Sequence, residues 1–183
     1  MANHTVTSTP TQQNPLFAQG CPRKPTYQPV SRCTRKLSRM DVSAQRVIPV
    51  KPGQVAAYAM DWRHDHEWTQ GITRAELTAE AAGGGFGVGA EVTRTAYFLG
   101  KRIDYVLRVE EHEPPHLLDM RSVRGPFPMH VTYRFDDHPD GTLAQIRVRG
   151  DAGGFYRIAG PLLGPMVRAN LRKDLRDLER AVS

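Results

Sequence analysis

The sequence predicts an α+β fold in which a curved, seven-stranded antiparallel sheet wraps around one long C-terminal helix. Seven strand-like segments lie between residues 42 and 149, and most are joined by short turns, which favours antiparallel pairing. Two short helices are predicted between the first two strands, and residues 155–182 carry an apolar stripe at helical spacing. A strongly curved sheet closed by one helix does not fill its own interior. The fold therefore predicts a ligand cavity between sheet and helix.

The strands are identified by period-two alternation and by β-branched residues. The clearest is the fourth, in which Ile103, Tyr105, Leu107 and Val109 alternate with polar or charged residues. Glycine- and proline-containing turns separate it from its neighbours. The predicted strands are 42–50, 73–81, 91–99, 103–109, 116–123, 129–135 and 144–149.

The predicted helices place aromatic side chains close to the sheet. A first short helix follows Lys51-Pro52-Gly53, and Asp61 can cap a second over 61–68. Trp62 and Trp68 are six residues apart and so lie on different faces of that helix, which predicts one packed on the sheet and one at a pocket mouth. Pro161 and Pro165 are expected to bend the last helix and to open a gap beneath it.

The charge of the chain resides in its N-terminal segment. Residues 1–40 hold six Lys and Arg and no Asp or Glu, whereas the remaining 19 basic residues are balanced by 19 acidic ones. We expect residues 1–40 to form a disordered basic tail and residues 41–183 to form one domain. An alternative is that Met40 is the true start. Because the domain is neutral, nucleic-acid binding by it is not expected.

The positions of the cysteines and the hydropathy of the chain indicate the cellular compartment of the protein. Both cysteines, Cys21 and Cys33, lie in the predicted tail, so no disulfide framework is expected in the domain. A reducing, cytoplasmic location fits this pattern best. No run of 18 apolar residues occurs in the sequence, and no transmembrane segment is predicted.

Two motifs suggest a site but favour ordinary structure. Five glycines within 83–89 resemble a phosphate-binding loop, but no Lys-Ser/Thr pair and no predicted helix follow them. His64-Asp65-His66 suggests a metal site, yet helical residues two apart point to different sides. We therefore expect a turn at the glycines, no bound metal and no cofactor.

Several segments taken in order resemble the SRPBCC superfamily, the START and polyketide cyclase/dehydratase-like proteins with a helix-grip fold. The resemblance covers residues 42–182 nearly completely. It implies a seven-stranded sheet that grips the C-terminal helix around a hydrophobic ligand, without one shared catalytic triad. The segments that carry it are Val47-Ile48-Pro49-Val50, Asp61-Trp62-Arg63-His64-Asp65-His66-Glu67-Trp68, Gly87-Val88-Gly89, Phe98-Leu99-Gly100-Lys101-Arg102-Ile103, Glu113-Pro114-Pro115 and Gly153-Gly154-Phe155.

The predicted ligand site combines the aromatic residues of the short helices with inward positions on two strands and the last helix. Tyr105 and Tyr133 each offer an aromatic wall and one hydroxyl group, although plain core packing is the alternative for both. Met129 and Met166 are adaptable gap fillers. The predicted ligand-binding residues are Trp62, His66, Trp68, Tyr105, Met129, Tyr133, Leu162 and Met166.

Two functions remain open from the sequence. The first is binding, transport or sensing of a small hydrophobic or aromatic ligand. The second is a metal-free enzyme of the polyketide cyclase/dehydratase type, in which an acid or base acts beside a polarised carbonyl. The sequence assigns no catalytic residue; His66, Asp104 and Arg121 are the candidates for such chemistry. It leaves the oligomeric state and the ligand open.

The tail composition leads to a prediction about stability. A chain that starts at Met40 should melt within a few degrees of the full-length protein, because the removed segment is too polar and proline-rich to contribute packing. Differential scanning calorimetry of both chains measures this. A larger fall in melting temperature, equivalent to about 1 kcal/mol or more, would show that residues 1–39 stabilise the domain.

Overall fold

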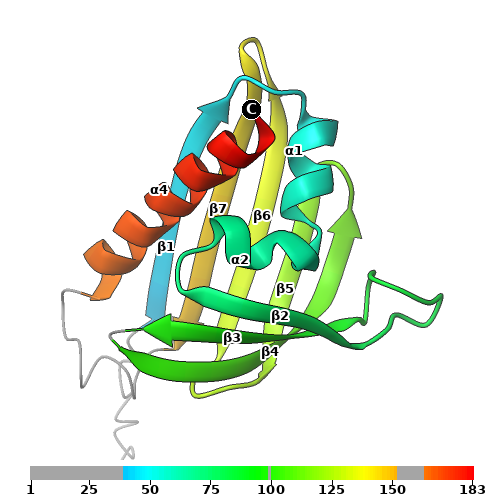
Figure 1. Cartoon of the computed structure of the whole chain (residues 1–183), viewed down its shortest axis with the longest axis vertical. Helices are drawn as coiled ribbons and strands as arrows, with labels where there is room; N and C mark the ends of the chain where they lie inside the picture. Colours follow the sequence, from blue (N-terminus) through cyan, green and yellow to red (C-terminus); the bar gives the residue numbers. More distant parts are fainter. Residues whose placement is uncertain (1–38, 99, 152–162) are drawn as a thin grey trace, which may run out of the picture. The chain divides into compact units, whose positions relative to one another are not determined.

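The computed structural model describes residues 39–98, 100–151 and 163–183, which form one curved antiparallel sheet and the helices that cover it (Figure 1). The strand order is β1-β7-β6-β5-β4-β3-β2, so the first and last strands of the chain pair with each other. This confirms the predicted helix-grip class. The elements are β1 (Arg39–Ile48), α1 (Pro52–Ala59), the 3-10 helix η1 (Trp62–His64), α2 (Asp65–Trp68), β2 (Ile72–Ala79), β3 (Glu91–Phe98), β4 (Lys101–Glu113), β5 (Leu117–Arg124), β6 (Met129–His138), β7 (Gly141–Asp151) and α4 (Leu163–Val182).

The sheet is bent so that β2, β3 and β4 turn across the direction of β1, β7 and β6 (Figure 1). Register shifts accompany the bend. The β2–β3 pairing shifts between Ile72 and Arg74 and again between Leu77 and Ala79, and the β4–β5 pairing shifts at two places. An irregularity of this kind increases local twist and bends a strand. The bend gives the sheet a concave face, across which α4 lies.

The core lies between this concave face and the helices. Leu171, Leu175 and Leu178 of α4 are buried, and their spacing of three and four residues places them on one face of the helix. They join a hydrophobic cluster with inward residues of β1, β4, β5, β6 and β7. Trp68 of α2 belongs to the same cluster and meets the ring of Tyr133 edge-on, with ring centroids 5.5 Å apart.

The link from β1 to β2 crosses the concave side as three short helical pieces. Pro52 occupies the start of α1, where its missing N–H costs no hydrogen bond. Asp61 accepts a hydrogen bond from the Arg63 N–H at 3.0 Å, which confirms the predicted cap. The predicted helix over 61–68 is divided into η1 and α2. The division gives Trp62 and Trp68 different surroundings.

Other boundaries differ from the predictions by a few residues. The first strand begins at Arg39, three residues earlier than expected, and β4 continues to Glu113 rather than Val109. The glycines of 83–89 lie in the turn region between β2 and β3, as predicted. The first part of the predicted last helix, 155–162, lies outside the described residues and includes Pro161.

Candidate functional site

A cavity of about 190 Å³ opens between α4, the segment that leads into β2, and the β3–β4 and β5–β6 turns. We call it the grip cavity. Most of its lining is apolar, and the polar contributions come from two tyrosines and from Thr69, Gln70 and Asn170. The lining residues are Met40, Thr69, Gln70, Ile72, Ala96, Tyr97, Phe98, Ile103, Tyr105, Pro126, Phe127, Pro128, Met129, Val148, Gly150, Val167 and Asn170.

A buried ion pair lies behind the wall of the grip cavity. Arg94 Nε donates to Asp65 Oδ2 at 2.7 Å, and the two residues are only 3% and 1% exposed. Arg94 is an inward residue of β3 and pairs in register with Tyr105 of β4. Asp65 comes from the start of α2. The pair therefore joins the sheet to the short helices across the interior.

The pair is electrically balanced. Burial alone would lower the pKa of Arg94, but Asp65 and the nearby tyrosines outweigh it and raise that pKa, so the guanidinium stays protonated. Burial raises the pKa of the Asp65 carboxyl, and the attraction of Arg94 opposes that rise. A second contact of Arg94 is weak, with Nη2 4.0 Å from the Met120 sulfur. The charge of Arg94 is thus compensated by one carboxylate.

Tyr105 connects the ion pair with the grip cavity. Burial raises the pKa of its hydroxyl, and the charge of the neighbouring Arg94 opposes that rise. Because an arginine side chain has only donors, the Tyr105 oxygen can only accept from Arg94. Its own hydroxyl proton is left to donate elsewhere. Tyr105 also lines the cavity.

Three buried polar atoms near the Arg94–Asp65 pair have no hydrogen-bond partner among the residues described. Within the described residues, Asp65 Oδ1, Trp68 Nε1 and Thr69 Oγ1 are buried without a hydrogen-bond partner. Each such atom costs free energy unless water or a ligand satisfies it. All three come from the five residues 65–69, and Thr69 lines the grip cavity.

A further buried carboxyl lies on α4. Asp174 Oδ1 accepts the Gln70 backbone N–H at 2.8 Å, and Gln70 Nε2 donates to Asp177 Oδ2 at 2.7 Å. Burial raises the pKa of Asp174 to about 7. Asp174 follows the cavity-lining Asn170 by one helical turn and ties the segment before β2 to α4. It thus holds one side of the cavity in place.

The predicted site residues fall into separate places. Tyr105 and Met129 line the grip cavity, whereas Tyr133 and Trp68 are buried in the core next to it. Met166 is partly buried against the core but does not line the cavity, and Leu162 lies outside the described residues. Their role in ligand binding stays a prediction.

The remaining candidates lie away from the cavity. His66, Asp104 and Arg121 are exposed, and none of them lines the grip cavity. Asp104 accepts from Thr95 at 2.7 Å, and Arg121 lies 3.5 Å from Glu110. Trp62 lines a second pocket that shares no residue with the first.

Sequence reasoning missed the three buried charged residues next to the grip cavity, Arg94, Asp174 and Asp65. Arg94 stands between Val92 and Ala96 in the inward register of β3, where the expected residue is apolar, and that interruption was the available signal. Asp174 similarly falls within the leucine stripe of α4. In the sequence, Asp65 stands out only as the middle of a His-Asp-His motif, because its partner is 29 residues away.

Of the two histidines near α2, His64 makes contacts within the short helices. In residues 39–98, 100–151 and 163–183 no three His, Cys, Asp or Glu side chains are arranged to hold a metal ion. His64 instead stacks on Tyr58, with centroids 4.2 Å apart, and contacts Glu67 at 3.0 Å.

Among the described helices, none has the length and hydropathy to cross a membrane.

A sheet that grips its C-terminal helix around such a cavity defines the SRPBCC superfamily of ligand-binding and polyketide cyclase-like domains. The chain belongs to the family described as "Polyketide cyclase / dehydrase and lipid transport", which matches residues 39–183. A comparison with curated proteins found no match.

Solved structures show the same fold at low sequence identity. TTHA0849 from Thermus thermophilus is 22% identical, with a TM-score of 0.64 over 78% of this chain and 96% of that one. A START superfamily protein from Mycobacterium smegmatis is 16% identical, with a TM-score of 0.58 over 78% and 93%. The Zhui aromatase/cyclase from Streptomyces sp. R1128 is 15% identical, with a TM-score of 0.59 over 79% and 93%.

The buried ion pair leads to a stability prediction. Arg94→Met should lower the free energy of unfolding by about 3–5 kcal/mol, because it leaves Asp65 as a buried, unpaired carboxyl. Arg108→Met is the matched control. Arg108 is exposed on the neighbouring strand and pairs with Glu91 at 2.6 Å, and its loss should cost less than about 1 kcal/mol. Urea unfolding measures the free energy of unfolding of both variants. Equal losses in the two variants would contradict a structural role of the buried Arg94–Asp65 pair.

Proposed function

We propose that the protein binds a small, largely apolar ligand in the grip cavity, with an uncharged acceptor oxygen of the ligand directed at Tyr105. The observation that carries the proposal is the position of Tyr105, which lines the cavity and is the cross-strand neighbour of the buried Arg94. Apolar side chains of β3, β4, β6, β7 and α4 surround the rest of the ligand. Such a combination of apolar walls with few polar groups is typical of small-molecule sites.

The charge balance favours an uncharged polar group on the ligand. Asp65 already neutralises Arg94, and its second oxygen, Oδ1, is free to accept a hydrogen bond. A ligand carboxylate placed there would meet the Asp65 carboxylate as well as Arg94 and would lose its hydration. A ketone or alcohol oxygen accepts from Tyr105 without that cost. We therefore expect ketones or alcohols to bind more tightly than carboxylates of equal length.

The second candidate is an enzyme of the polyketide cyclase/dehydratase type. The same neighbouring position of Arg94 and Tyr105 favours it, because a donor beside a buried cation stabilises negative charge that develops on a carbonyl oxygen. Proton removal also needs a base. The described lining of the grip cavity contains no Asp, Glu, His or Lys, and the nearby Asp174 is bonded to the Gln70 N–H. Binding is therefore the preferred proposal.

Substitution of Tyr105 tests the proposed donor. Tyr105→Phe should weaken the binding of 2-octanone by about 0.5–1.5 kcal/mol, the value of one hydrogen bond, and should change octanoate binding less. Tyr97→Phe is the control, because Tyr97 also lines the cavity but is 52% exposed, whereas Tyr105 is the neighbour of the buried Arg94. Isothermal titration calorimetry measures the six affinities of the wild type and the two variants for 2-octanone and octanoate. If both substitutions have equal effects on 2-octanone, Tyr105 is not the donor.

Turnover distinguishes the enzyme from the binding protein. The wild type and Tyr105→Phe are incubated with a poly-β-ketone substrate, and cyclised products are followed by mass spectrometry. A binding protein gives no product above the uncatalysed rate. Product formation that Tyr105→Phe lowers by about a hundredfold or more would establish the cyclase and contradict the preferred proposal.

A further inference from the structure

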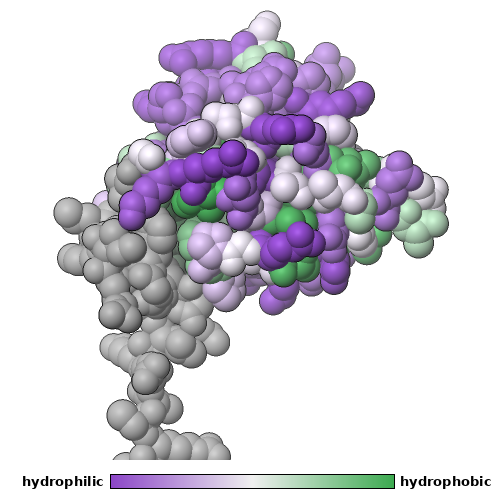
Figure 2. All heavy atoms as spheres, turned by 60° about the horizontal axis from the view of Figure 1, so that its bottom comes forward, coloured by the Kyte–Doolittle hydropathy of each residue, from purple (hydrophilic) through white to green (hydrophobic). Residues whose placement is uncertain are grey.

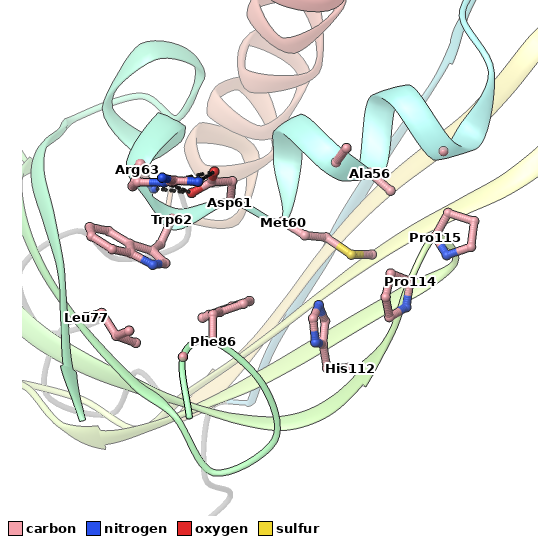
Figure 3. Close-up of a pocket in the computed structure, with 13 residues that line it drawn as sticks. Ala56, Met60, Asp61, Trp62, Arg63, Leu77, Phe86, His112, Pro114 and Pro115 are labelled. Atoms are coloured by element: carbon pink, nitrogen blue, oxygen red, sulfur yellow. Dashed lines mark hydrogen bonds and ion pairs between the residues drawn. The ribbon is translucent and has the colours of Figure 1, made fainter. Parts of the chain in front are cut away.

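A second pocket lies between the short helices and the far ends of β2 and β4 (Figure 3). It has a volume of about 510 Å³. One wall comes from α1 and η1, and the other comes from β2, the β2–β3 glycine turn and the β4–β5 turn. We call it the α1 slot. Its lining residues are Gly53, Ala56, Ala57, Met60, Asp61, Trp62, Arg63, Leu77, Gly85, Phe86, His112, Pro114 and Pro115.

The two walls of the α1 slot carry rings. Figure 3 shows Trp62 on the helical side and Phe86 and His112 on the sheet side. Phe86 and His112 meet edge-on, with centroids 5.2 Å apart and planes at 74°. Met60 and Leu77 complete the apolar surface between them. Rings on both walls suit a flat aromatic molecule, since aromatic groups gain from stacked and edge-on contacts beyond the area they bury.

Two polar groups in the slot have no protein partner. In the part of the chain that the structure describes, His112 and Trp62 form no hydrogen bond through their ring nitrogens. Desolvation lowers the pKa of His112, so the imidazole is neutral near pH 7 and has one nitrogen that accepts and one that donates. The slot thus offers an acceptor at His112 and donors at both rings.

The charged residues of the slot are already paired. Arg63 contacts both carboxylate oxygens of Asp61, with Nε at 2.9 Å from Oδ1 and Nη2 at 2.6 Å from Oδ2. This two-point bond satisfies the guanidinium fork. The slot therefore has no net charge to attract an anion or a cation. Its chemistry fits an uncharged molecule.

We propose that the α1 slot is a second binding site, separate from the grip cavity, for an uncharged planar aromatic compound whose phenolic hydroxyl donates to His112. The slot lies within the size range of ligand pockets, about 300–1,000 Å³, whereas the grip cavity is smaller. Trp62 and Phe86 hold the ring system, and the neutral imidazole selects the hydroxyl. This inference does not depend on the ligand of the grip cavity.

The experiment compares 2-naphthol with its methyl ether by isothermal titration calorimetry at pH 7.5. The ether has the same rings but no hydroxyl proton. In the wild type, 2-naphthol should bind about three- to tenfold more tightly than the ether, as expected for one hydrogen bond. In His112→Phe, which keeps a ring at that position, the two affinities should become equal.

A second variant blocks the slot without touching the core. Ala57 is exposed on α1 and lines the slot, so Ala57→Arg should fill it and abolish 2-naphthol binding. Gln54→Arg is the matched control, since Gln54 is exposed on the same helix but does not line the slot, and it should bind 2-naphthol like the wild type. Melting temperatures establish that each variant is folded.

The outcomes divide clearly. Loss of 2-naphthol binding in Ala57→Arg, together with loss of the hydroxyl preference in His112→Phe, supports the site. Three results overturn it: no binding of 2-naphthol to the wild type, equal binding to Ala57→Arg and Gln54→Arg, or a hydroxyl preference that persists in His112→Phe. Tyr105→Phe should leave 2-naphthol binding unchanged, which separates this site from the grip cavity.

Discussion

The buried ion pair between Arg94 and Asp65 is the constraint on which the interior depends. It links β3 to the start of α2, and nearly all of both residues is removed from solvent. Desolvating two charges costs as much as their attraction returns, so apolar residues of similar size often serve stability equally well. Stability alone therefore does not account for the pair. A role in positioning Tyr105 at the wall of the grip cavity does account for it, and this role motivates the proposed function.

The fold makes room for such a pair because its sheet is bent. Strands β2–β4 turn across the others, and both α4 and the short helices lie over the concave face and share its core (Figure 1). The exposed side of this region, in the view of Figure 2, carries mostly hydrophilic residues, with apolar residues between them. Most charged residues of this region are thus on the surface, whereas the Arg94–Asp65 pair is buried.

Much of the architecture was predictable because it follows from local patterns. Alternation along Ile103–Val109 and the leucine stripe of α4 identify buried faces without knowledge of the partner. The same alternation identified Tyr105, and it placed Met129 on the inward face. The ion pair was not predictable, because it depends on which inward residues the bend brings opposite each other. The α1 slot depends on the path of the glycine turn at 83–89, which glycine composition leaves open.

The most direct test of this account is the double replacement of the pair by apolar residues, Arg94→Met with Asp65→Leu. The variant and the wild type are compared by urea unfolding and by titration with 2-octanone. If the pair serves ligand binding, the variant keeps its stability within about 2 kcal/mol and binds 2-octanone severalfold more weakly, because Tyr105 is no longer held and polarised by Arg94. A variant that is folded and binds 2-octanone as tightly as the wild type would contradict the account.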